Sequence, residues 1–130
     1  TAYDVLDELR RRGYATQMIP GITSFCAVAA TLGTSLTDRD SPLHIYPDET
    51  GNLDMALELS GTKVLMKSGK AIGETAAALS CRGLAKEASM VADCGLPSQR
   101  IFSEMTDLPE NVGVSSTVIV PEGHRAARKK

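Results

Sequence analysis

A short strand pattern in the middle of the chain is followed almost at once by a helix pattern. Residues 62–67 begin with the β-branched Thr62 and have the brevity and apolar centre of a buried strand. After Gly69, residues 71–82 are rich in alanine and favour a helix. A strand, a loop and a helix in this order form the basic unit of α/β folds. The pattern therefore predicts a sheet covered by helices.

Similar patterns alternate along the rest of the chain. The remaining helix patterns cover residues 3–12, 25–32 and 52–59. The remaining strand patterns cover residues 14–19, 43–46, 87–93, 100–104 and 115–120. Glycine or proline, which end helices and strands, stands at Gly13, Pro20, Gly33 and Pro47. We expect an α/β fold, a mixed sheet flanked by helices, in which the short final strands permit antiparallel pairing.

Length and charge exclude several classes of function. The 130 residues carry a net charge of -2 and contain no long basic stripe, so we do not expect nucleic acid to be a partner. No apolar run approaches the ~20 residues of a membrane-spanning helix, and the beginning of the chain lacks the layout of a signal peptide. We therefore expect a cytoplasmic protein that does not associate with membranes.

Metal and redox chemistry have no motif in the sequence. Cys26, Cys81 and Cys94 are odd in number and widely spaced, so they form neither a disulfide framework nor a CxxC pair. His44 and His124 have no Cys, Asp or Glu at ligand spacing, so we expect no metal site.

Familiar catalytic and nucleotide-binding motifs are also absent. Gly69-Lys70 after a strand resembles part of a phosphate-binding loop, but Val64 stands where that loop needs its first glycine. Ala71 stands where the loop needs a Ser or Thr for magnesium. No GxGxxG follows a predicted strand, and no catalytic triad signature occurs. We therefore name no catalytic residue.

Three modest motifs follow one another along most of the chain. They are the junction from Ile19 to Ser24, the strand end from Val64 to Lys67, and the turn from Cys94 to Pro97 that leads to Arg100. In this order they resemble the tetrapyrrole methylase family, whose members transfer a methyl group from S-adenosylmethionine to a tetrapyrrole. Within the family, the second motif favours enzymes of cobalamin biosynthesis that act on precorrin-2 or cobalt-factor II at carbon 20.

The resemblance also implies a domain organisation. Family members have two α/β domains with the cofactor between them, so residues 1–21 would complete the N-terminal domain and link it to a C-terminal α/β domain at 22–122. The basic residues 123–130 would form a disordered tail. The chain begins within a helix pattern and lacks an initiator Met, the family's glycine-rich loop and its Gly-Asp-Pro segment. We therefore expect an inactive fragment of a homodimeric enzyme, although a processed protein would begin in the same way.

The family's cofactor contacts, carried over to this chain, fall on four positions and two weaker ones: Thr23, Ser24, Met66 and Gly95, then Met90 and Thr117. A helix start offers free amides and hydroxyls to polar parts of a cofactor. A methionine at a strand end can offer its backbone to adenine and its thioether to the ring face. A glycine lets a ligand approach the backbone.

Other interpretations remain open. A Thr-Ser pair can simply cap a helix, a methionine can fill a gap in the core, and a glycine can permit a turn. The chain could also belong to a methylase of the same fold with another acceptor. A third hypothesis is a non-catalytic α/β module that dimerises and binds no methyl donor, which the missing glycine-rich loop favours.

Overall fold

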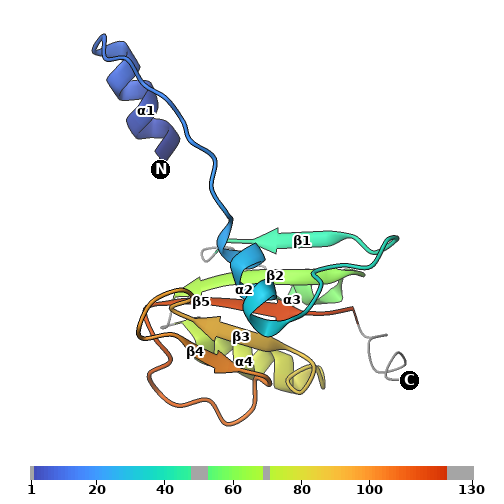
Figure 1. Cartoon of the computed structure of the whole chain (residues 1–130). Coiled ribbons are helices and arrows are strands. Elements are labelled where there is room, and N and C mark those ends of the chain that lie inside the picture. The colour runs from blue at the N-terminus through green and yellow to red at the C-terminus, as the bar shows by residue number, and fades with distance from the viewer. Residues whose placement is uncertain (1, 48–52, 69–70, 123–130) are drawn as a thin grey trace.

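Five strands form one mixed sheet with helices on both of its faces (Figure 1). The computed structural model describes residues 2–47, 53–68 and 71–122. In chain order the elements are α1 (Ala2–Arg11), α2 (Ser24–Leu32), β1 (Leu43–Tyr46), α3 (Leu53–Glu58), β2 (Thr62–Ser68), α4 (Ile72–Cys81), β3 (Ser89–Ala92), β4 (Arg100–Phe102) and β5 (Ser115–Val120). The expected α/β fold with a mixed sheet is confirmed.

The strand order across the sheet is β1-β2-β5-β3-β4. β1 and β2 are parallel, whereas β5 is antiparallel to both of its neighbours, β2 and β3. β4 is antiparallel to β3 and is one of the two outermost strands of the sheet. As a result β1, β2 and β3 run in the same direction, and their carboxyl ends lie at one edge of the sheet, where β5 begins.

The two faces of the sheet bury separate apolar clusters. On one face, α3 and α4 contribute Leu57 and Leu79 to a large cluster with Leu65, Met90 and Val118. On the other face, Val28 and Ala29 of α2 contact Val91 and Ile119. The alternation of side chains along each strand assigns neighbouring residues to opposite faces. Of the helices that the structure describes, α2 packs against the second face.

α2 begins and ends where the sequence predicts. Thr23 has the extended backbone of an N-cap residue, and Gly33 ends the helix with a left-handed φ of 63°. The N–H of Gly33 donates to the carbonyl of Ala30 at 3.1 Å, which satisfies one of the last carbonyls of the helix. Small residues such as Ala29 let the helix backbone approach the sheet closely.

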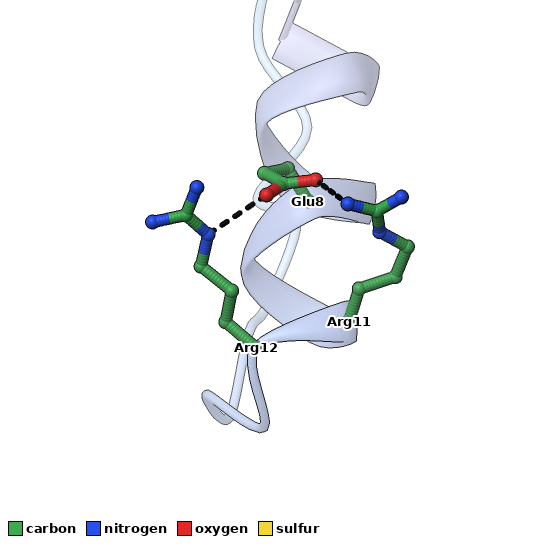
Figure 2. A network of polar contacts seen from close by, with 3 residues as sticks. All are labelled: Glu8, Arg11 and Arg12. Atoms are coloured by element: carbon green, nitrogen blue, oxygen red, sulfur yellow. Dashed lines mark hydrogen bonds and ion pairs between the residues drawn. The ribbon is translucent and has the colours of Figure 1, made fainter.

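α1 lies away from the sheet and is joined to it by an extended segment (Figure 1). Glu8 holds the last turn of this helix through ion pairs with Arg11 and with Arg12, whose Nε lies 2.7 Å from Glu8 Oε1 (Figure 2). These pairs are solvent-exposed, so each adds little to stability. Tyr3 and Val5 are each more than half exposed, and α1 therefore presents apolar surface to solvent.

The strand predicted at residues 14–19 is wrong. This segment has an extended backbone but pairs with no strand of the described chain, and Tyr14 and Ile19 remain 63% and 81% exposed. A local alternation of side chains favours a strand only where another strand supplies hydrogen bonds. The patterns at 87–93 and 100–104 do form strands, β3 and β4, but shorter ones. Asn52, the first residue of the helix pattern at 52–59, and the tail at 123–130 lie outside the described residues.

Candidate functional site

The carboxyl ends of the parallel strands bring several predicted site residues to one edge of the sheet. Met66 lies near the end of β2, and Gly95 lies just beyond the end of β3. Thr117 stands near the start of β5, which runs between these two strands. Open α/β sheets bind ligands outside the carboxyl ends of their strands. We define the candidate site by these residues, Met66, Gly95 and Thr117.

Met66 and Thr117 are direct partners in the ladder between β2 and β5. Thr117 is also the partner of Val91 in β3, so the three side chains form a row on the face that α2 covers. Met66 is half-buried, whereas Thr117 is 5% exposed. The row therefore combines a soft thioether with a hydroxyl at a nearly dry position, and a thioether makes favourable contacts with aromatic rings.

Gly95 occupies a position that needs glycine. Its φ is +82°, and a Cβ placed there would meet nothing within 4 Å. Its N–H donates to Oε1 of Gln99 at 2.8 Å, which closes a turn from residue 95 to residue 99. The exposed backbone of Gly95 is therefore open to a ligand while the turn around it is held by its own side chains.

Thr23 and Ser24 are exposed at the beginning of α2. The carbonyl of Thr23 accepts from the N–H groups of Cys26 and Ala27, each at 3.1 Å, and the Thr23 side chain forms no capping bond. A helix start leaves the amides of Ser24 and Phe25 without acceptors within the helix. The structure thus places the Thr-Ser pair on the helix that covers the face of Met66 and Thr117, with polar groups facing solvent.

Met90 lies apart from the other predicted residues. It is the ladder partner of Val118, so it points to the face of α3 and α4 rather than to that of Thr117. Its exposure is 0%, and it belongs to the larger apolar cluster. The structure therefore gives Met90 a place in the core and does not bring it to the candidate site.

Asp93 is not among the six predicted site residues, although it joins the turn of Gly95 to the segment that leads into β5. Its Oδ1 accepts the backbone N–H groups of Val114 and Ser115 at 3.2 and 3.1 Å. Its Oδ2 accepts the hydroxyl of Ser98 at 3.1 Å. The Ser115 N–H is the main cause that lowers the pKa of the Asp93 carboxyl, against burial, which raises it. An Asp directly after a strand and two residues before a glycine is a turn signal that could have identified it.

A second carboxylate holds the opposite end of the sheet. Glu122 accepts the N–H of Gly61 at 3.0 Å and also the hydroxyl of Ser41. The pKa of Lys63 is lowered because the side chain is buried. The negative charge of Glu122 offsets part of this shift. Glu122 therefore stabilises the end of the sheet farthest from the candidate site.

The cavities described in the structure lie elsewhere. One of about 430 Å³ opens between α4 and the segment at 105–112, where Ala76, Met105 and Val112 line it. Another of about 490 Å³ lies against α1 and is lined by Val5 and Leu9, among others. Neither of these two cavities is lined by a predicted site residue.

Among the residues that the structure describes, no cluster of three or more His, Cys, Asp or Glu could hold a metal ion. Within the same ranges, no helix has both the length and the apolar character needed to cross a membrane.

Comparisons with known proteins agree with this fold. The family model for tetrapyrrole (corrin/porphyrin) methylases matches residues 1–109. The cobalamin biosynthesis protein CobIJ of Mycobacterium tuberculosis, and that of Mycobacterium bovis, is 28% identical over 118 residues, which is 89% of this chain and 23% of CobIJ. The chain therefore spans about a quarter of the length of these relatives.

Two solved structures are also similar. A cobalt precorrin-4 methyltransferase of cobalamin biosynthesis matches with a TM-score of 0.67 and 18% identity over 90% of this chain and 56% of that one. Uroporphyrin-III C-methyltransferase from Thermus thermophilus matches with a TM-score of 0.61 and 24% identity over 87% of this chain and 54% of that one. Together with the family match over most of its length, this identifies the chain as a member of the tetrapyrrole methylase family.

Proposed function

We propose that this chain is the C-terminal part of an S-adenosylmethionine-dependent methyltransferase that methylates a tetrapyrrole in cobalamin biosynthesis. The acceptor that we propose is precorrin-2 or cobalt-factor II, and the reacting atom is carbon 20. The observation that carries the proposal is the pairing of Met66 with Thr117 at the carboxyl edge of the sheet, the edge at which Gly95 follows β3, in a member of this family.

The residues at this edge suit S-adenosylmethionine. Met66 and Thr117 offer a thioether and a hydroxyl beside the apolar side chain of Val91, which suits adenine. The open space at Gly95 admits a ligand close to the backbone. Thr23 and Ser24 at the start of α2 suit the polar groups of an amino acid moiety. Of the six predicted contacts, Met66, Thr117, Thr23 and Ser24 thus have side chains that suit the cofactor. Gly95 contributes its exposed backbone, and Met90 lies in the core and is not part of the proposed site.

The role proposed for this chain is to bind the cofactor and to orient it toward the methyl acceptor. The cofactor, when bound, supplies a methyl group on a sulfonium centre, which leaves a neutral thioether after transfer to a nucleophilic carbon. The buried row of Thr117 and Val91 excludes water from one side of the site. Holding two ligands in line supplies most of the acceleration in such a reaction, so no acid-base pair is required of these residues.

We also propose that residues 1–21 complete a preceding domain and link it to the C-terminal domain, which residues 22–122 form. We propose further that the enzyme is a homodimer. The share of the solved relatives that the chain covers, 56% and 54%, supports a larger whole. The exposure of Ile19 and Ile22, 81% and 85%, supports a covering partner for this segment. On this view the 130-residue chain by itself is inactive.

Calorimetric binding of S-adenosylhomocysteine tests the proposal. We would compare the 130-residue chain with the product of the complete reading frame that encodes it. Met66→Asp should abolish binding by the complete protein, because it adds a charge to a half-buried site. Met55→Asp is the matched control, since Met55 is 57% exposed on α3 at the other face. If neither protein binds, the cofactor assignment is wrong and a non-catalytic module becomes the better account.

The acceptor requires a separate experiment. The complete protein would be incubated with S-adenosylmethionine and either precorrin-2, its cobalt complex or uroporphyrinogen III, and the products would be located by mass spectrometry and NMR. Methylation at carbon 20 supports the proposal. Methylation of another carbon or another tetrapyrrole would overturn the acceptor while leaving the cofactor site intact.

A further inference from the structure

Asp93 combines a positive φ with near-complete burial. Its φ is +50°, a region that L-residues other than Asn and Asp seldom adopt. The exposure of Asp93 is 9%, so the carboxylate is almost entirely removed from solvent. A nearly buried acid held at a positive φ beside a candidate site calls for a role at that site.

The carboxylate joins the two segments that carry the candidate site. Ser98, on the turn that contains Gly95, donates to one oxygen, and the backbone of Val114 and Ser115 donates to the other. The Asp93 N–H in turn donates to the carbonyl of Ser115 at 2.7 Å. Ser115 begins β5 two residues before Thr117. The carboxylate therefore fixes the turn of Gly95 against the strand of Thr117.

A glycine across from Asp93 makes this contact possible. Gly113 has a φ of +123°, and a Cβ built there would lie 2.9 Å from Oδ2 of Asp93 and 3.2 Å from the Cβ of Ala92. The segment leading into β5 can therefore approach the carboxylate only because this residue lacks a side chain. Two residues with positive φ thus meet at one point of the edge.

The geometry points to Asp93 as a positioning residue of the cofactor site, which holds Gly95 and Thr117 in the arrangement that binds the cofactor. The inference rests on the proposed function and adds to it a residue outside the six predicted positions. The lowered pKa of Asp93 agrees with a carboxylate that stays ionised as it accepts these bonds. Asp93 acts through other residues, so its effect should appear in affinity for the cofactor.

The test measures S-adenosylhomocysteine affinity and folding stability in parallel for variants of the complete protein. Asp93→Ala removes all three bonds, and we expect affinity to fall at least about tenfold. Asp93→Gly is the second variant, because it relieves the positive φ and so keeps the protein folded while losing the same bonds. Asp93→Asn keeps an acceptor for the two amides and tolerates the positive φ, so it should bind within about threefold of the unchanged protein.

Glu122→Ala provides the matched control. It also removes a carboxylate from a backbone N–H and a serine hydroxyl, but at the opposite end of the sheet. We expect it to lower stability and leave affinity unchanged. Amide hydrogen exchange at Val114 and Ser115, measured without ligand, should accelerate in Asp93→Ala and Asp93→Gly only.

The outcomes distinguish failure of the positioning role of Asp93 from failure of the proposed function. Unchanged affinity in Asp93→Gly, or an equal loss of affinity in Glu122→Ala, would overturn the positioning role while the proposed function stands. Absence of binding by the unchanged complete protein would overturn the proposed function and the positioning role with it. Loss of affinity confined to Asp93→Ala and Asp93→Gly, with binding retained by Asp93→Asn, supports both.

Discussion

Met66 in β2 lies directly opposite Thr117 in β5, and both side chains belong to the face of the sheet that α2 covers. The two residues are far apart in the chain and meet only because the last strand inserts beside the second. Because the two side chains differ in burial, we propose different roles for them. Half-buried Met66 can contact a ligand with its side chain, whereas Thr117 offers a single hydroxyl at a nearly dry position.

Thr117→Val tests that hydroxyl. Valine keeps the β-branched shape, so we expect folding stability to change by less than about 1.5 kcal/mol. If the hydroxyl bonds to the cofactor, the affinity of the complete protein for S-adenosylhomocysteine should fall roughly 3- to 10-fold. Thr62→Val is the control, since Thr62 is buried at the opposite end of β2. Equal affinities for the two variants would remove Thr117 from the site.

Gly61→Ala should destabilise the chain strongly. Gly61 has a φ of +89°, and a Cβ there would lie 2.3 Å from the carbonyl oxygen of Pro42. The strained φ and the clash with backbone together predict a loss of about 2 kcal/mol or more in the free energy of unfolding. Urea denaturation measures this loss.

The comparison for that experiment is Gly73→Ala. Gly73 lies in α4, and a Cβ there meets nothing within 4 Å. Alanine favours the helix, so stability should rise by up to about 1 kcal/mol. A similar loss in both variants would contradict the geometry at Gly61.

The pH dependence of stability should change in Asp93→Asn. The pKa of Asp93 is lowered in the folded chain, so its ionised form stabilises the fold. This contribution is fully present above the unfolded pKa of about 3.9 and is lost as the pH falls through the lower, folded value. Urea unfolding from pH 7 to pH 2 should therefore show a steeper loss in the unchanged chain than in Asp93→Asn. Parallel curves would show that the carboxylate gains nothing on folding.

Ile22→Ser should behave differently in the two lengths of protein. Ile22 is 85% exposed in the chain described, so the change should alter the stability of the 130-residue chain by less than about 0.5 kcal/mol. If a preceding domain covers this segment, the same change should lower the stability of the complete protein by about 1 kcal/mol or more. Thermal and urea denaturation of both lengths check the prediction. Equal effects would argue that the segment has no covering partner.

Local patterns predicted most elements of the fold because glycine, proline and apolar spacing act over a few residues. The strand predicted at 62–67 and the helix predicted at 71–82 appear as β2 and α4 with ends shifted slightly. The predicted strand at 14–19 failed because strands depend on partners that local sequence does not specify. Tyr14 and Ile19 remain exposed, and their segment joins no ladder of the described sheet.

The candidate site was predicted less well, for a related reason. Met90 and Val91 are neighbours with similar side chains, and only the register with β5 decides which one shares the face of Thr117. The sequence suggested Met90, whereas the structure gives that place to Val91. A local turn signal marks Asp93, but its contacts with Gly113 and Ser115 involve residues twenty or more positions later, which local sequence does not indicate.

The position of β5 has a consequence for synthesis of the chain. β5 is the last of the described strands along the chain, yet it lies at the centre of the sheet and separates β2 from β3. Until the ribosome has released residues 115–120, the nascent chain can form a β1-β2 pair and a β3-β4 pair, but nothing joins them. Two-stranded pairs are marginal in water, and such unpaired edges attract other chains. Residues 115–120 are therefore needed to close a sheet whose other four described strands precede them in the chain.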